Sequence, residues 1–113
     1  MHELAITKSI LNICLEEEKK YNFKKVKEIN IKVGELTGLV PDCINYYFNI
    51  ISKGTVAEKA SINIIKMPIV IKCGNCNYSG TINLSEYECP KCKAYDFKII
   101  EGNEFYLESM EVL

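Results

Sequence analysis

Four of the six cysteines form two close pairs in the second half of the chain. Cys73 and Cys76 are one pair and Cys89 and Cys92 the other, in the pattern C-x2-C-x12-C-x2-C. A C-x2-C turn lets two thiolates converge on one ion, and two such turns supply a tetrahedral set of four sulfur ligands. Zinc suits such a set best. Two disulfides in an oxidising compartment, or a rubredoxin-like iron centre, are the alternatives that the spacing leaves open.

A metal held by four protein thiolates keeps no open position for an activated water. The pattern therefore predicts a structural zinc and disfavours zinc hydrolysis. Cys14 and Cys43 lie outside the pattern, on expected helices, and we interpret both as core residues. The chain has no phosphate-binding glycine loop and no nucleophile with a plausible base, so we predict that the protein is not an enzyme.

The only histidine, His2, directly follows Met1. A free α-amine, the amide nitrogen of residue 2 and its imidazole can close two adjacent chelate rings on one metal ion. Loss of the amide proton requires a metal that favours square-planar nitrogen coordination, namely Ni(II) or Cu(II). Glu3 adds an oxygen donor nearby, and we expect Met1 to be retained because the initiator is normally removed only ahead of small residues. The alternative is an exposed terminal histidine without a role.

The composition is that of a globular protein, with 113 residues of which 48% are hydrophobic and 26% charged. Fourteen basic and fifteen acidic side chains leave a net charge of −1, whereas a general nucleic-acid binder usually carries a basic excess. No apolar run approaches the ~20 residues of a membrane span, and no signal peptide is evident. We therefore expect a cytoplasmic protein with reduced thiols and no membrane partner.

Hydrophobic spacing predicts two helices and three strands outside the cysteine-rich segment. Apolar residues from Ile6 onward follow the helical period, and Lys19 and Lys20 suit the end of that helix. Pro41 is typical of the first turn of a helix, and Gly54 is placed to end it. Strands are predicted where apolar and polar residues alternate. The expected elements are helices over residues 6–21 and 41–53 and strands over 28–33, 61–66 and 104–112.

The segment from residue 72 to about 102 differs in composition from the rest of the chain. Cysteine, glycine, asparagine and proline replace the periodic aliphatic residues there. A segment of roughly 30 residues cannot bury enough apolar surface to order itself, so we expect a metal-held insert. We expect the last strand to rejoin the sheet of the N-terminal part, which makes the main domain discontinuous.

Several short motifs occur in an order that resembles a known family. They are Met1-His2-Glu3-Leu4, Val33-Gly34-Glu35-Leu36, Gly54-Thr55, Pro68, the two C-x2-C pairs and Gly102-Asn103-Glu104. Over residues 1–113 the chain resembles the HypA/HybF family, the nickel metallochaperones of NiFe-hydrogenase maturation. A C-x2-C pair alone is unspecific, but the order and spacing of the whole set are highly specific.

The resemblance implies an α+β fold. A nickel-binding domain with two helices on a small mixed sheet would comprise residues 1–67 and 103–113, and an inserted four-cysteine zinc ribbon would comprise residues 68–102. It also implies nickel ligands from the Met1 amine, from the amide and imidazole of His2, and in some members from the third residue, here Glu3. Some relatives add a second histidine from the zinc domain, which this chain lacks. Glu3, Asp42 or a water would then complete the site.

The partners implied by the resemblance are the GTPase HypB, the hydrogenase large subunit and, in some members, urease maturation proteins. Nickel would be the cargo and zinc the structural cofactor, in a monomer or weak homodimer. One departure from the family is Lys93-Ala94, where relatives often have Gly-Ser, and it affects the local turn.

The alternative function is a zinc-ribbon interaction module that binds protein or nucleic acid. Such a module would carry a basic stripe with exposed aromatic residues, and lysines and aromatic residues do occur together in the ribbon, although the balanced charge weakens this interpretation. These residues are Lys91, Lys93, Lys98, Tyr87, Tyr95 and Phe97.

Overall fold

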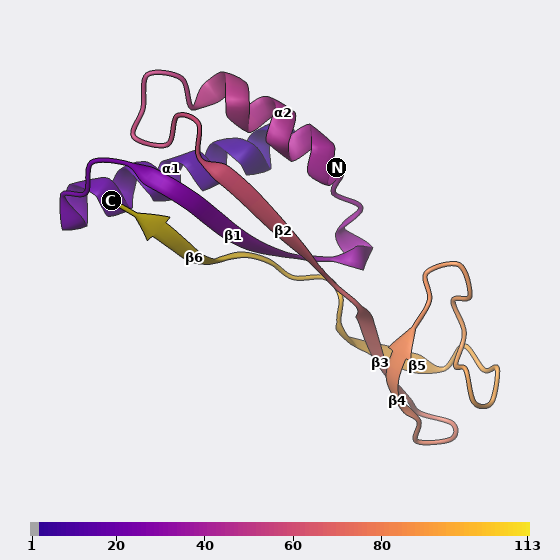
Figure 1. Ribbon diagram of the computed structural model, residues 1–113. Helices are drawn as coiled ribbons and strands as arrows, with labels where there is room; N and C mark the ends of the chain where they lie inside the picture. The colour runs from indigo at the N-terminus through magenta and orange to yellow at the C-terminus, as the bar shows by residue number, and fades with distance from the viewer. Residues whose placement is uncertain (1–2) are drawn as a thin grey trace. The chain divides into compact units, whose positions relative to one another are not determined.

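The structure is a computed structural model that describes residues 3–113 (Figure 1). The chain divides into two compact units, which we describe separately. The first comprises the described part of Met1–Ile31, together with Leu39–Ile65 and Tyr106–Leu113. The second comprises Lys32–Gly38 and Lys66–Phe105. No helix among residues 3–113 is long and apolar enough to cross a membrane.

Two helices form one layer of the first unit. Helix α1 spans Glu3–Tyr21 and helix α2 spans Pro41–Ile51, with Pro41 in its first turn. The two helices pack side by side, and their N-terminal ends lie at the same end of the pair (Figure 1). The predicted range of α2 agrees with the structure to within two residues, whereas α1 begins three residues earlier than predicted. Its buried face includes Ile10 and Cys14, and that of α2 includes Ile44 and Phe48.

The other layer is a three-stranded sheet in the order β2-β1-β6. Its strands are β1 (Val26–Gly34), β2 (Ser61–Met67) and β6 (Phe105–Val112). Strands β1 and β2 run in the same direction, with α2 in the connection between them, and β6 runs in the opposite direction (Figure 1). The predicted mixed sheet is confirmed, and the last strand does rejoin it. β1 is the central strand, and its apolar residues Val26, Ile29, Ile31 and Val33 are fully buried.

The second unit is built on an antiparallel sheet in the order β4-β3-β5. Its strands are β3 (Ile69–Cys73), β4 (Ser79–Ile82) and β5 (Phe97–Glu101). Hydrophobic spacing did not predict these strands, because each has only four or five residues. Their small core consists of Ile69, Ile71, Ile82, Cys73 and Cys89, with Leu36 and Phe97 among the side chains packed against it.

Two glycines in the second unit bring their backbones into direct contact. A Cβ on Gly34 would overlap the carbonyl group of Gly102, which itself has a φ of +118°. The N–H of Leu36 donates to the same carbonyl at 2.8 Å, and the N–H of Gly34 donates to the carbonyl of Glu104 at 2.8 Å. Neither glycine can therefore accept a side chain without a shift of the backbone.

Gly34→Ala is expected to lower the free energy of unfolding by about 3 kcal/mol, since the new methyl group would overlap backbone atoms. Chemical denaturation of the metal-loaded protein measures this change. Gly38→Ala is the matched control, because Gly38 has a positive φ, of 69°, but open space around it. The control is expected to cost about 1 kcal/mol. Equal losses in the two variants would show that the close backbone contact does not limit residue 34.

The two cysteines outside the pattern differ in their environment. Cys14 is fully buried, with its Sγ 3.8 Å from the Sδ of Met110, so the core interpretation is confirmed for it. Cys43 is only half-buried, so it does not fill the core as expected; its place in the first turn of α2 leaves one side open. Burial raises the pKa of the Cys14 thiol to about 11.

This pKa predicts a loss of stability at alkaline pH. The unfolded chain ionises Cys14 near pH 9, whereas the folded chain keeps it neutral up to about pH 11, so the contribution of the thiol to stability is lost as the pH rises through that window. We expect a decrease of about 2 kcal/mol between these limits. Denaturation curves from pH 8 to pH 11 should show that Cys14→Ala has a shallower decline. Identical slopes would contradict the prediction.

Candidate metal centre

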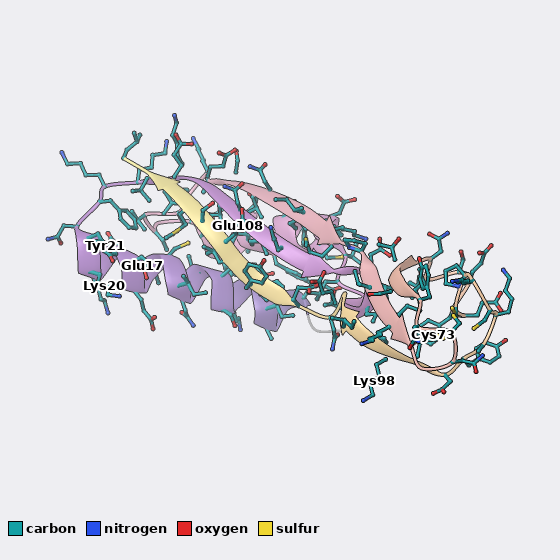
Figure 2. The ribbon with its side chains drawn as sticks, turned by 90° about the horizontal axis from the view of Figure 1, so that it is seen from below. Glu17, Lys20, Tyr21, Cys73, Lys98 and Glu108 are labelled. Carbon is teal, nitrogen blue, oxygen red and sulfur yellow. The ribbon has the colours of Figure 1, made fainter. Side chains whose placement is uncertain are left out.

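The four predicted metal ligands come together in the second unit. Cys73 ends strand β3, and Cys76 lies in the turn that leads to β4. Cys89 and Cys92 lie in the long connection between β4 and β5. All four Sγ atoms lie within 4.8 Å of one another, and Figure 2 shows sulfur atoms gathered beside Cys73.

The sulfur separations fit a single tetrahedral ion. The Sγ atoms of Cys73 and Cys92 are 3.7 Å apart, and those of Cys76 and Cys89 are 3.6 Å apart. A tetrahedron with zinc–sulfur bonds of about 2.3 Å places its sulfurs about 3.8 Å apart. Disulfide bonds need about 2.05 Å, and all four cysteines are free thiols. The residues therefore fit a four-thiolate metal site, and no position is left open.

Asn75, between the first two cysteines, directs two donors at the sulfurs. Its backbone N–H lies 3.3 Å from the Sγ of Cys73, and its side-chain Nδ2 lies 3.6 Å from the Sγ of Cys92. The pKa of the Cys92 thiol is lowered to about 6. The largest cause is the hydrogen bond from the backbone N–H of Ala94, and the next is the hydrogen bond from the side chain of Asn75. These donors favour the thiolate, the form that binds metal. Sequence reasoning missed Asn75, whose only signal is its place inside a C-x2-C turn.

The other thiols show why a cation is needed. Burial alone would raise the pKa of the Cys89 thiol. Hydrogen bonds from backbone N–H groups, of which that of Cys92 is the largest, outweigh burial, so the pKa of Cys89 is lowered. Cys76 accepts a hydrogen bond from the backbone of Tyr78 that lowers its pKa. Burial and the neighbouring thiols outweigh that bond and raise the pKa of Cys76 to about 12. Four thiolates so close together repel one another, so a divalent ion is required for all of them to ionise.

Each pair of cysteines is followed by a residue with left-handed backbone. Asn77 has a φ of 62° and Lys93 a φ of 64°. The N–H of Lys93 donates to the carbonyl of Cys89 at 2.9 Å, which closes the second turn. Asparagine tolerates this conformation, whereas a lysine is strained in it. This strain is the structural consequence of the departure noted at Lys93.

Lys93→Gly is expected to raise the free energy of unfolding of the metal-loaded protein by about 0.5 kcal/mol, because glycine adopts a positive φ without strain. The ion pair lost with Glu88 is exposed, at 4.0 Å, and contributes little. Lys91→Gly is the matched control, because Lys91 is not one of the residues with a positive φ in the described part of the chain. Glycine relieves no strain there, so this variant should have a lower free energy of unfolding. Thermal denaturation compares the two, and destabilisation by both would contradict the account of the turn.

The N-terminal candidates are only partly placed. Met1 and His2 lie outside the described residues, so the structure neither brings them together nor separates them. Glu3 is the first residue of α1, and its carboxylate accepts a hydrogen bond from the N–H of Val40 at 3.2 Å. Asp42 is exposed in the first turn of α2.

These features define a small α+β protein with an inserted four-cysteine metal ribbon. The family model described as "Hydrogenase/urease nickel incorporation, metallochaperone, hypA" matches residues 1–112. The chain therefore belongs to the HypA family of nickel metallochaperones.

Relatives and solved structures agree with this assignment. The chain is 40% identical over 120 residues to the hydrogenase maturation factor HypA of Methanocaldococcus jannaschii, covering 99% of this chain and 97% of the relative. It is 33% identical over 112 residues to the hydrogenase maturation factor HypA of a Dehalococcoides mccartyi strain, covering 99% of this chain and 94% of the relative. Its fold is similar to the solution structure of a HypA protein, with a TM-score of 0.73 and 26% identity over 100% and 97% of the two chains. The fold is also similar to the solution structure of the nickel metallochaperone HypA from Helicobacter pylori. That comparison has a TM-score of 0.67 and a sequence identity of 25%, and it covers 100% of this chain and 98% of the other.

Proposed function

We propose that the protein binds Ni(II) at Met1 and His2 and delivers it for the maturation of NiFe-hydrogenase, with a structural zinc at the four cysteines. The observation that carries the proposal is the match of nearly the whole chain to a nickel-incorporation family. The chain also provides two different donor sets. One is the group of four thiols, and in the proposal the other would be the amine of Met1 beside the imidazole of His2.

The different roles proposed for the two metal sites, structural for zinc and delivery for nickel, follow from ligand chemistry. Cys73, Cys76, Cys89 and Cys92 would hold zinc with every position filled, so this site suits structure and not exchange. Nickel at Met1 and His2 would have few protein ligands, so ligand exchange with a receiving protein can be fast. Protons compete for the amine, the imidazole and the amide, so nickel binding should weaken as the pH falls.

The partners and setting are also proposals. We infer that HypB supplies nickel, that the hydrogenase large subunit receives it, and that urease maturation proteins are further clients. We further propose a cytoplasmic monomer or weak homodimer without catalytic activity, with residues 68–102 as the zinc-ribbon domain and residues 1–67 and 103–113 as the nickel-binding domain. The family's role in hydrogenase and urease nickel incorporation supports maturation partners in general.

A nickel titration tests the proposed site. Zinc-loaded protein that begins at Met1 is titrated with Ni(II) by calorimetry, with visible absorption as a second readout. We expect one equivalent with a square-planar spectrum, and loss of both signals in His2→Ala with zinc retained. Glu16→Ala is the control, because Glu16 lies well away from the N-terminus of α1 and carries a solvent-accessible carboxylate. Equal binding by the wild type and His2→Ala would overturn the nickel site.

The alternative, a ribbon that binds protein or nucleic acid, has one structural point in its favour. Tyr95 is 77% exposed in the ribbon. Tyr87, by contrast, packs edge-on against Phe97, with ring centroids 5.1 Å apart. Titration with single- and double-stranded RNA and DNA at low salt tests the nucleic-acid version, and absence of binding eliminates it.

A further inference from the structure

A side-chain contact joins the start of α1 to the start of α2 within the first unit. The Oε2 atom of Glu3 accepts a hydrogen bond from the backbone N–H of Val40 at 3.2 Å. Val40 is the N-cap of α2, and its apolar side chain makes no capping hydrogen bond. Pro41, which follows, has no N–H to offer. The carboxylate of Glu3, on helix α1, therefore accepts the hydrogen bond of a backbone N–H at the start of α2 for which α2 itself provides no side-chain acceptor.

Two further interactions hold Glu3 in place. The hydroxyl of Thr7 donates to the backbone carbonyl of Glu3 at 2.5 Å, within the first turn of α1. The N-terminal ends of α1 and α2 lie together (Figure 1), and both helix dipoles place partial positive charge there, which favours a carboxylate. The backbone and the side chain of the residue that follows His2 are thus both anchored.

We propose that Glu3 is a positioning residue, whose carboxylate holds the first turn of α1 against the start of α2, and not a nickel ligand. This inference rests on the proposed nickel site at those two residues. The two proposed ligand residues are adjacent in sequence to this anchored turn, so fewer backbone torsions have to be ordered when they chelate a metal. Without the anchor the first turn of α1 would fray, and binding would have to order it again.

The test uses zinc-loaded protein beginning at Met1 and three variants: Glu3→Gln, Glu3→Ala and the control Glu16→Ala. Nickel affinity is measured by calorimetry, the coordination by visible absorption, and the hydrogen bond by the NMR amide shift of Val40 without nickel. Glu3→Ala is expected to bind nickel about three- to tenfold more weakly with an unchanged absorption spectrum. Glu3→Gln should stay near the wild type, because its carbonyl oxygen still accepts the bond. The Val40 amide should shift strongly only in Glu3→Ala.

Two results would overturn the positioning role. The first is an equal loss of affinity in Glu3→Gln and Glu3→Ala with an altered spectrum, which would make the carboxylate a ligand. The second is a Val40 amide that is the same in the wild type and Glu3→Ala. Failure of the proposed function is distinguished by the wild type itself. If it binds nickel no better than His2→Ala, the role of Glu3 in nickel binding falls too, while the Val40 shift still reports the hydrogen bond.

Discussion

Replacing Cys89 by serine is expected to abolish metal binding in the second unit and to unfold it. Cys89 is fully buried and belongs both to the four-sulfur cluster and to the small apolar core. Structural zinc contributes on the order of 10 kcal/mol to such sites, more than this core can replace. Metal analysis should show that zinc is lost, and amide NMR should show collapse of the signals of residues 66–105. The α-helices lie in the first unit, so the helical signal in circular dichroism should remain.

Cys43→Ser is the control for this experiment. Cys43 is a half-buried thiol on α2, and its Sγ is not among those of the four-cysteine cluster. The control should keep one equivalent of zinc and an ordered ribbon. Full zinc content together with unchanged ribbon signals in Cys89→Ser would contradict the structural role of the cluster.

Extending the chain by three residues ahead of Met1 is expected to weaken nickel binding by roughly a hundredfold or more, although His2 and Glu3 are both retained. The extension moves the free amine away from the imidazole, so the two adjacent chelate rings cannot form and the effective concentration of the amine is lost. Calorimetric titration of the extended and native-start proteins, each loaded with zinc, measures the difference. Zinc content should be the same in both.

A one-residue extension is an informative companion. It places the imidazole third in the chain and adds a second amide nitrogen, so a four-nitrogen square-planar set can form. This variant should bind nickel at least as tightly as the native start and release it more slowly. Unchanged affinity in the three-residue extension would show that the terminal amine is not a ligand.

Local sequence signals predicted the elements whose start or periodicity is marked by residues within the element itself. Pro41 marks the start of α2, and the alternation in β1 indicated the strand correctly. The early start of α1 at Glu3 was missed because it is stabilised by Val40, far along the chain. Contacts of this kind leave no periodic trace in the sequence.

The ribbon shows the same limit. The spacing of the cysteines predicted the cluster, because the two C-x2-C turns are local. The strands around it were not predicted, since their core is completed by Leu36 from a distant segment and by the cysteines themselves. Nor does any local pattern indicate that Gly34 and Gly102 are in backbone contact.

Native mass spectrometry tests most directly the claim that the chain keeps two metals at two separate sites. The zinc-loaded protein with its native start is mixed with one equivalent of nickel, and the bound metals are identified from the intact mass. We predict one zinc and one nickel per chain in the wild type, and one zinc alone in His2→Ala. A species in which nickel has replaced zinc, or a nickel ion retained by His2→Ala, would contradict the account.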